Sequence, residues 1–349
     1  MVNRREARTA LFLIALMPTL GSSIALSASH PRFDDPADEA ALLALHASDA
    51  RVWTIGTRLA VAGAPLCPGQ FATEFSVQEA AQYGESYRAA ASRILGVGAQ
   101  PSASVVVPSS GAAAAGLRMG DSINAVDGAR VAGTGNASRR GAFSGVARVG
   151  LAIDAAARDG RLTVDVMRGA APLRLEIALA PGCATRFDVL PDGEEASANG
   201  SYVVVSSPLA ARLADDSDLA ALLAHEIAHN ILRHPQLLER RARGLLPGFG
   251  KSGRIMRATE LAADRLSMYL LALAGFDPAR AIPFWQRFGR RHDWGILSDR
   301  THPAWSDRIA TMREEIAHID VLKLRREPIR PPVSLLPATN VDSRRAQQR

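Results

Sequence analysis

The sequence predicts an α+β protein made of two parts, a mostly helical domain with a small sheet and a second domain rich in β-strands. Ala- and Leu-rich segments with helical periodicity occupy both ends of the chain, whereas Gly, Val and short alternating runs occupy its middle. The 349 residues, 47% hydrophobic and 22% charged, have ordinary globular composition for two domains.

Five segments have the periodicity of helices, at residues 40–61, 77–94, 216–234, 257–274 and 305–319. The third begins in an acidic cluster around Asp216, which suits a helix N-terminus, and ends before Pro235. The fourth is closed by Gly275. These helices supply the framework of the first domain.

Short β-type runs fall at residues 104–107, 123–126, 161–167 and 173–179, with a helix expected at 145–158 among them, and another strand at 202–206 follows an Asn-Gly turn. We therefore expect residues 29–93 to be the N-terminal helical segment of the first domain, 94–180 the β-rich domain and 181–320 the rest of the first domain. Residues 321–349 are basic and Pro-rich, and we expect a disordered tail.

Residues 1–28 have the pattern of an export signal. Three Arg residues precede an apolar run at 10–20, and small residues follow as a cleavage region. Pro18 and Gly21 make the run short for a membrane span. A periplasmic or secreted protein is expected, with an uncleaved N-terminal membrane anchor as the alternative. No later segment is apolar for long enough to cross a bilayer, so we expect no span in the mature chain.

The basic charge lies at the two ends of the chain. The formal net charge is +6. Residues 1–28 carry +2 and residues 321–349 carry +5, which leaves the body between them at −1. A nearly neutral body does not form a basic groove, so nucleic-acid binding is excluded.

The chain has two cysteines, Cys67 and Cys183. In an exported protein an even number favours a disulfide, with two free thiols as the alternative. Closing so long a loop would restrict the unfolded chain by about 4–5 kcal/mol in the entropy model. Because no CxxC spacing occurs, the cysteines do not form a zinc site.

The run His225-Glu226-Ile227-Ala228-His229 lies within the helix expected at 216–234. A spacing of four places the two imidazoles on one face of the helix, one turn apart, where a single metal ion can bridge them. Glu226 is placed beside that face to take a proton from a metal-bound water. The motif predicts a hydrolytic metal site.

Glu260 and Asp264 lie on the next long helix, and Glu260 follows His229 by 31 residues. Two His and one Glu leave a fourth position open, which is typical of one catalytic Zn²⁺ per chain rather than of a structural zinc. Asp264 is expected to hold the outer N–H of an imidazole, that of His225. The alternative is two helices with coincidental His residues and an ordinary acidic pair.

The segments HEIAHNILRH, ELAADR and then Thr301-His302-Pro303 occur in this order over residues 195–320. They resemble the soluble branch of a zinc metallopeptidase family, of gluzincin type, that includes the CAAX prenyl protease and the bacterial heat-shock membrane protease HtpX. The resemblance implies a zincin-type fold, zinc ligands at His225, His229 and Glu260, and a catalytic base at Glu226. Cleavage of prenylated proteins is not carried over, because the membrane-embedded relatives have several spans.

Two further residues or segments near this site have open roles. In relatives, a His-Pro pair such as that at His302 lies near the cleft, where it could stabilise the oxyanion or equally cap the following helix. The strand at 202–206 is expected either to form an open sheet edge that pairs with a peptide or to be an ordinary internal strand.

The middle of the chain shows a second resemblance. The order of residues 94–97, 105–107, 112–121 and 126–128 resembles a PDZ domain of the kind found in bacterial periplasmic proteases. It implies that backbone N–H groups at Leu95, Gly96 and Val97 hold the terminal carboxylate of a C-terminal peptide ligand, whose chain pairs with the sheet edge. A PDZ domain serving as a spacer or lid is the alternative.

Together these patterns predict a zinc endopeptidase that cleaves protein or peptide substrates, by resemblance unfolded or misfolded envelope proteins. One alternative is a binding or chaperone-like protein with a vestigial zinc site, although the presence of Glu226 argues against it. Another is a zinc amidase acting on a non-protein substrate. The PDZ-like segment favours protein substrates.

Overall fold

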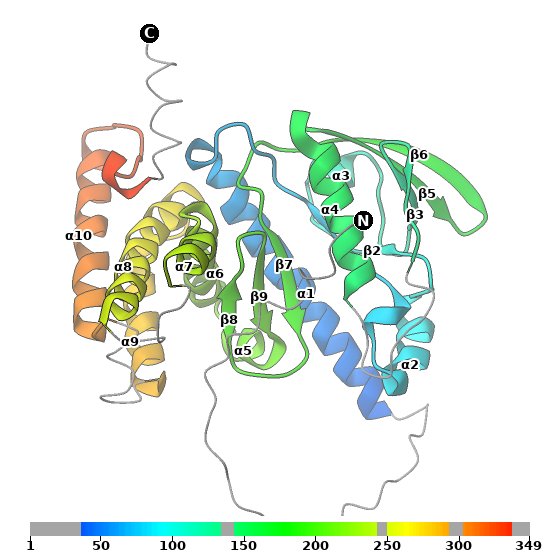
Figure 1. Ribbon diagram of the computed structural model, residues 1–349, viewed down its shortest axis with the longest axis horizontal. Helices are drawn as coiled ribbons and strands as arrows, with labels where there is room; N and C mark the ends of the chain where they lie inside the picture. Colours follow the sequence, from blue (N-terminus) through cyan, green and yellow to red (C-terminus); the bar gives the residue numbers. More distant parts are fainter. Residues whose placement is uncertain (1–35, 134–142, 243–249, 293–302, 337–349) are drawn as a thin grey trace, which may run out of the picture.

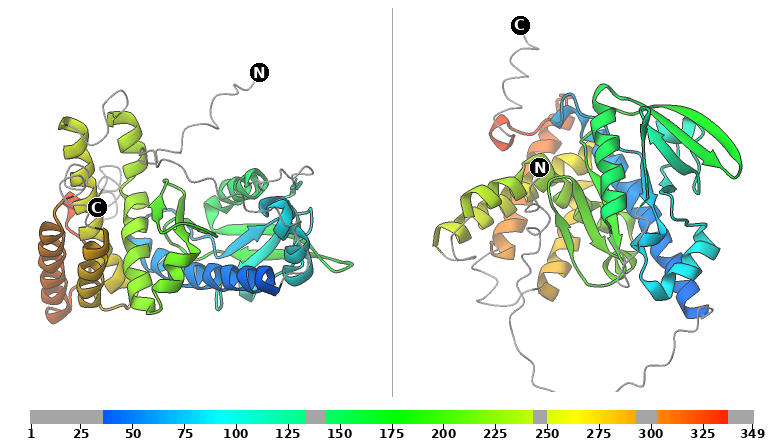
Figure 2. Two further views of the ribbon diagram at one scale, coloured as in Figure 1. Left: turned by 90° about the horizontal axis from the view of Figure 1, so that it is seen from below. Right: turned by 45° about the vertical axis from the view of Figure 1, so that its right-hand side comes forward.

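The computed structural model describes residues 36–133, 143–242, 250–292 and 303–336. It is an α+β structure, as the sequence predicts. Helices gather at one end of the molecule, a small sheet lies in the middle, and a larger sheet with its own helices lies at the other end (Figures 1 and 2). The long helix α1 (Pro36–Ala62) contacts all three.

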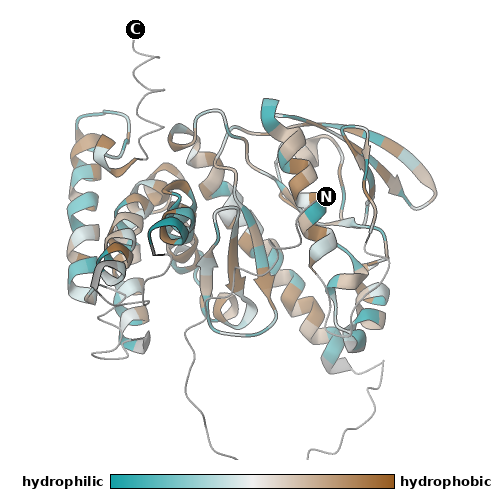
Figure 3. Ribbon diagram, viewed as in Figure 1, coloured by the Kyte–Doolittle hydropathy of each residue, from teal (hydrophilic) through white to brown (hydrophobic). Residues whose placement is uncertain are grey.

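The helical end surrounds one central helix. Besides α1, this end contains the helices that follow the strands in the sequence: α5 (Ser207–Arg212), α6 (Asp216–Ile231), α7 (His234–Ala242), α8 (Gly250–Leu273), α9 (Ala281–His292) and α10 (Trp305–Leu324). Asp215 caps α6 by accepting a hydrogen bond from the N–H of Ser217. Helix α6 packs against α1, α8 and α9, and its apolar residues are buried in the largest core. Figure 3 shows hydrophilic colours mainly on the outer helices α7 and α10.

The small sheet has the order β7-β9-β8, formed by β7 (Arg186–Leu190), β9 (Tyr202–Ser206) and β8 (Ala196–Ala198). Strand β7 is parallel to β9 and β8 is antiparallel to it. Residues 202–206 are therefore an internal strand, and the edges of the described sheet are β7 and β8. Strand β8 is the edge that contacts α6.

The larger sheet has the order β1-β2-β3-β5-β6, with β4 paired to β3. Its strands are β1 (Phe75–Gln78), β2 (Ser102–Val106), β3 (Ser122–Val126), β4 (Ala129–Arg130), β5 (Arg161–Arg168) and β6 (Ala171–Ala178). Helices α2 (Glu85–Leu95), α3 (Gly111–Ala114) and α4 (Ser144–Ala156) accompany it. Asp127 and Gly128 both have positive φ and join β3 to β4 in the hairpin expected for this pair.

The β-rich part extends further towards the N-terminus than the sequence predicted. Strand β1 and the non-helical residues up to 84 replace the start of the helix expected at 77–94, of which only α2 is formed. A bridge between Phe71 and Pro181 closes this part. Just outside the bridge, Cys67 and Cys183 form the expected disulfide. The β-rich part is thus a closed insertion spanning 71–181, where 94–180 was expected.

The chain beyond residue 320 is also more ordered than expected. Helix α10 continues to Leu324, and Leu335 and Leu336 are buried in the main core. A disordered tail from 321 is therefore wrong up to residue 336. The rest of the tail, the expected export signal and His302 lie outside the described residues. Among the described helices, none is both long and apolar enough to cross a membrane.

Candidate metal centre

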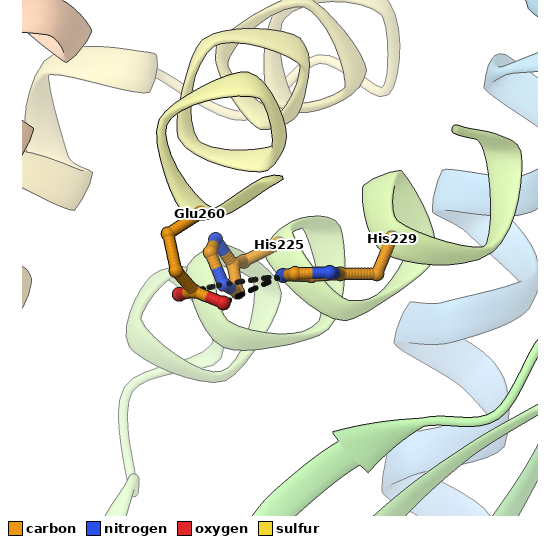
Figure 4. A group of neighbouring side chains, drawn as sticks. All are labelled: His225, His229 and Glu260. Atoms are coloured by element: carbon orange, nitrogen blue, oxygen red, sulfur yellow. Dashed lines mark hydrogen bonds and ion pairs between the residues drawn. The ribbon is translucent and has the colours of Figure 1, made fainter. Parts of the chain in front are cut away.

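Helices α6 and α8 bring three potential metal ligands together. His225 and His229 project from one face of α6, and Glu260 projects towards them from α8 (Figure 4). The Nε2 atoms of the two imidazoles are 3.1 Å apart. One carboxylate oxygen of Glu260 lies 3.5 Å from Nε2 of His225, and the other lies 3.5 Å from Nε2 of His229.

These separations fit a tetrahedral zinc ion. Ligand atoms that bind zinc at roughly 2.0–2.2 Å in a tetrahedron are about 3.3–3.6 Å from one another. The observed separations of 3.1–3.5 Å match this spacing. Two imidazoles and one carboxylate also form the donor set of a catalytic zinc, which keeps its fourth position for water or substrate. The residues present therefore fit Zn²⁺.

Asp264, one turn after Glu260 on α8, lies behind His225. Its Oδ1 atom is 3.0 Å from Nδ1 of His225. This ring nitrogen has no hydrogen bond of ordinary geometry, so the close approach is an electrostatic contact between the imidazole and the carboxylate. Asp264 is fully buried. It thereby favours the orientation of His225 that directs Nε2 towards the metal position.

Arg308 on α10 holds Asp264 in place. Its Nε and one Nη each donate a 2.6 Å hydrogen bond to a different carboxylate oxygen of Asp264. The guanidinium carbon lies 4.5 Å from the ring centre of Trp305 and 5.2 Å from that of Trp285. Trp285 also contacts His225 edge to face at 5.3 Å. Arg308 thus supplies the cation that a buried carboxylate requires.

His229 has a different partner. Its Nδ1 atom lies 3.1 Å from Nδ1 of His234, the first residue of α7. Arg233, between the two helices, adopts a left-handed backbone with φ of 56°. This residue ends the helical path and turns His234 back towards His229. The outer nitrogens of both ligand imidazoles are therefore contacted by buried side chains.

Burial and mutual charge set the protonation of the metal-free site. Burial lowers the pKa of His225, but the contacts with Asp264 and Glu260 outweigh it and raise the pKa to about 10. Burial, opposed by Glu260, lowers the pKa of His229 to about 3. Burial alone would raise the pKa of Glu260, yet the neighbouring imidazoles and Arg308 hold it well below its ordinary range. The site therefore keeps a carboxylate next to a cation and a neutral imidazole.

Glu226 is buried beside the ligands, and burial raises the pKa of its carboxyl to about 7, with Glu260 adding to the shift. A carboxyl group with a pKa near neutrality can both take and return a proton at physiological pH. In the metal-free site, Glu226 is therefore a group that can exchange a proton near neutral pH.

Residues 195–246, which include this part of α6, match the model of peptidase family M48. This segment is thus similar to peptidase family M48. A beta-barrel assembly-enhancing protease of Vibrio cholerae serotype O1 is 32% identical over an alignment of 159 residues, which covers 36% of this chain and 33% of the relative. The chain therefore spans about a third of the length of this curated relative.

Some residues of the M48-type site could not be found from the sequence alone. Arg308 lies 44 positions after its partner Asp264, a separation at which no local periodicity applies. His234 lies five positions after His229 and would be off its face if the helix were continuous, so the sequence alone does not bring the two imidazoles together. The sequence signal for this break is Pro235, because proline is tolerated in the first turn of a helix and here stands at the second position of α7.

The expected carboxylate-binding loop is not supported by the structure. Leu95 and Gly96 end helix α2, with Gly96 as its left-handed cap, and Leu95 and Val97 are buried against Leu42 of α1. The strand that follows, β2, lies inside the sheet between β1 and β3. The terminal strand at this end of the sheet is β1, which does not follow residues 95–97, so a carboxylate-binding role for these residues stays a prediction.

Proposed function

We propose that this chain is an exported, zinc-dependent endopeptidase that hydrolyses peptide bonds in unfolded or misfolded envelope proteins. The observation that carries the proposal is the group of three ligand atoms separated by 3.1–3.5 Å. The M48 match and the name of the Vibrio relative support it. The disulfide between Cys67 and Cys183 supports an oxidising compartment such as the periplasm.

In this proposal His225, His229 and Glu260 hold one Zn²⁺. When bound, the ion supplies Lewis acidity towards the scissile carbonyl and makes water at its open position more acidic. Glu226 takes the proton from the attacking water and later gives it to the leaving amine. The Asp264–Arg308 pair and His234 keep the two imidazoles in their ligand orientation throughout.

The small sheet offers a place for the substrate backbone. Strand β8 is an edge strand next to α6, the helix that carries two of the ligands. A substrate segment that adds to β8 as a further strand would be fixed by main-chain hydrogen bonds whatever its sequence. Such recognition suits unfolded chains, whose backbone is accessible, and favours proteins over non-protein amides as substrates.

We also propose that the insertion at 71–181 is a PDZ-like peptide-binding domain. The hairpin at Asp127-Gly128, the antiparallel sheet and the helix α4 next to β1 support this assignment. The peptide would add to β1, beside α4, rather than to a strand that follows Leu95–Val97. A C-terminal peptide is one ligand that such an edge accepts.

The decisive test compares digestion of unfolded casein by the wild-type protein and by Glu226→Gln, with bound zinc measured in both. We expect both proteins to hold one zinc per chain, and the variant to lose at least about 100-fold in rate because the amide of Gln does not accept the proton of the attacking water. Glu314→Gln, at an exposed position on α10, is the matched control and should retain full activity.

Equal digestion by the wild type and Glu226→Gln would refute the mechanism. Zinc binding without any digestion by the wild type would instead favour a binding or chaperone-like protein. Digestion of a cell-wall amide but not of casein would indicate a zinc amidase.

A further inference from the structure

A cavity of about 1310 Å³ lies between the β-rich insertion and the small sheet. Strand β1 and helix α4 form one side, strands β7, β8 and β9 form another, and α1 lies along it. Figure 1 shows α4 standing beside β7 with α1 crossing behind both. None of the three metal ligands lines this cavity. Its volume exceeds that of ordinary small-molecule pockets, which is about 300–1,000 Å³.

The side formed by the insertion has the features of a strand-binding groove. All four residues of β1 line the cavity, and β1 is the terminal strand of its sheet, so no described strand pairs with its outer side. Next to β1, helix α4 lines the cavity with Val146, Gly150 and Ile153 on one face, and Ile153 reaches from there into the core of the insertion. Together they offer main-chain hydrogen bonds and apolar contact to an extended chain.

The opposite side is fixed in place by Arg186 of β7. Its guanidinium forms an ion pair with Asp154 of α4 and donates a 3.1 Å hydrogen bond to the hydroxyl of Tyr202. Gly150 of α4 permits this approach, because a Cβ atom there would lie 2.3 Å from a guanidinium nitrogen of Arg186. The insertion is thus docked onto the small sheet through specific contacts, and the cavity is a built feature of the fold.

The cavity lining is acidic. Asp49 of α1 and Asp188 of β7 both line it, with Asp192 and Glu195 further along, whereas Arg186 is the single Lys or Arg among the described lining residues. Arg186 is already engaged by Asp154. The Oδ1 atom of Asp49 is inaccessible to solvent and has no hydrogen-bond partner in the described structure. Buried carboxylates without a cation are costly, so this arrangement favours a ligand that brings one.

We propose that this cavity binds an extended polypeptide segment that carries a Lys or Arg side chain. The segment's backbone pairs with β1, its apolar side chains contact α4, and its cation lies between Asp49 and Asp188. Residues of β8 also line the cavity, and β8 contacts the helix that carries the metal ligands. A chain bound here therefore extends towards the metal centre. The inference deepens the proposed function, on which it rests for the fate of the bound chain, by naming the substrate class.

Peptide binding to the full-length Glu226→Gln protein tests this inference without the complication of cleavage. The probes are fluorescent peptides about ten residues long, with alternating apolar residues and one central Lys, Gln or Glu. Fluorescence anisotropy gives each Kd. We expect the Lys peptide to bind at least about 10-fold more tightly than the Glu peptide, because only the Lys peptide compensates the buried carboxylates.

The variant Asp49→Asn/Asp188→Asn, made in the same Glu226→Gln background, should lose this preference. The matched control is Asp165→Asn/Glu176→Gln, which removes two acidic groups from the hairpin of β5 and β6, outside the cavity lining. It changes the net charge by the same amount and should retain the preference. Thermal unfolding of each variant confirms folding, and Asp49→Asn alone should show an intermediate preference.

Equal affinity for the Lys and Glu peptides, no binding of any peptide, or an unchanged preference in Asp49→Asn/Asp188→Asn would overturn the inference. The outcome is independent of catalysis. If the wild type digests casein but no peptide binds, the proposed cavity site is refuted and the proposed peptidase activity is not. If the peptides bind with the expected preference but the wild type does not digest casein, the peptidase proposal is refuted and the cavity site is supported.

Discussion

At the scale of single residues, the two ligand imidazoles are held by chemically different partners. His225 lies against an anion, Asp264, which is itself paired with Arg308. His229 lies against a neutral imidazole, because burial lowers the pKa of His234 to about 4. An anionic partner strengthens electron donation to the metal more than a neutral one does. The two nitrogen ligands are therefore expected to differ in basicity.

We predict that His234→Ala weakens zinc binding and lowers kcat/KM by about 10-fold each, within the range that such outer partners contribute. The physical reason is the lost contact with Nδ1 of His229, which leaves that ring free to turn. Zinc affinity from chelator competition and kcat/KM on a fluorogenic peptide are the measurements.

His234→Gln is the conservative comparison, because its side-chain amide can restore one hydrogen bond to His229 and recover part of the zinc affinity. A structural role of His234 would lower the melting temperature of both variants equally and leave zinc affinity in the folded protein unchanged. That result would contradict the positioning role.

At the scale of elements, the break between α6 and α7 decides whether His234 reaches the site. The break occurs at Arg233, whose backbone is in the left-handed region although the residue is not glycine. L-residues pay about 1–2 kcal/mol for this conformation and glycine pays little. The functional geometry is thus maintained at a local cost in backbone energy.

The effect of substituting Arg233 should therefore depend on how readily the new residue adopts a left-handed backbone. We predict that Arg233→Gly retains zinc affinity and is at least as stable as the wild type, whereas Arg233→Val loses about 1–2 kcal/mol of unfolding free energy. The Val variant should also bind zinc more weakly, because the helix break that places His234 is disfavoured. Urea unfolding and chelator competition measure the two effects. Equal stability of the Gly and Val variants would show that the backbone at this position is not strained.

Periodicity predicted the elements that are long or that contain a specific turn. The segments around α6, α8 and α10 carry enough apolar repeats to be recognised, and Asp127-Gly128 specifies its hairpin. Strands β1, β7 and β8 have only three to five residues each, too few to establish alternation. Strand β1, which these patterns do not predict, is the terminal strand of the larger sheet, whereas the loop expected at Leu95–Val97 precedes the inner strand β2.

The ligand set itself was predictable for a related reason. His225, His229 and Glu260 lie on two long helices, where a spacing of four fixes which side chains share a face. The partners Arg308 and His234 depend on how α10 packs and where α6 ends, which no local pattern specifies. Local rules thus identify the candidate ligands, and tertiary packing identifies the side chains that contact them.

At the scale of the whole molecule, the disulfide joins the chain segment that enters the β-rich insertion to the segment that leaves it. Cys67 and Cys183 flank the Phe71–Pro181 bridge and are buried in the main core, not in the insertion. The bond therefore anchors the insertion to the helical part that carries the candidate metal centre. It also restricts the unfolded chain over a separation of 116 residues.

We predict that Cys67→Ala/Cys183→Ala lowers the unfolding free energy by about 2–5 kcal/mol. Peptide binding in the cavity should weaken as well, because the cavity lies between the two parts that the disulfide joins. Urea unfolding and peptide anisotropy at a temperature where the variant remains folded are the measurements. A variant as stable as the wild type, with unchanged peptide affinity, would show that the docking of α4 through Arg186 suffices.

The acidic cavity should also make the whole molecule less stable as pH rises. Burial raises the pKa of Asp188 to about 6, and burial together with Asp188 raises that of Asp49 well above its ordinary value. The folded protein therefore binds more protons than the unfolded chain above pH 4 or so, and this contribution to stability is lost as pH rises through the folded pKa values.

Replacing both carboxyls with amides removes that dependence. We predict that Asp49→Asn/Asp188→Asn matches the wild type near pH 4 and exceeds its unfolding free energy by about 1–3 kcal/mol near pH 8, where the wild type carries the uncompensated charges. Urea unfolding across this pH range is the measurement. If the unfolding free energies of the wild type and the variant changed with pH in parallel, water or other groups would already solvate these carboxylates. Their charge would then not destabilise the free protein, and a Lys or Arg ligand would have no such charge to neutralise.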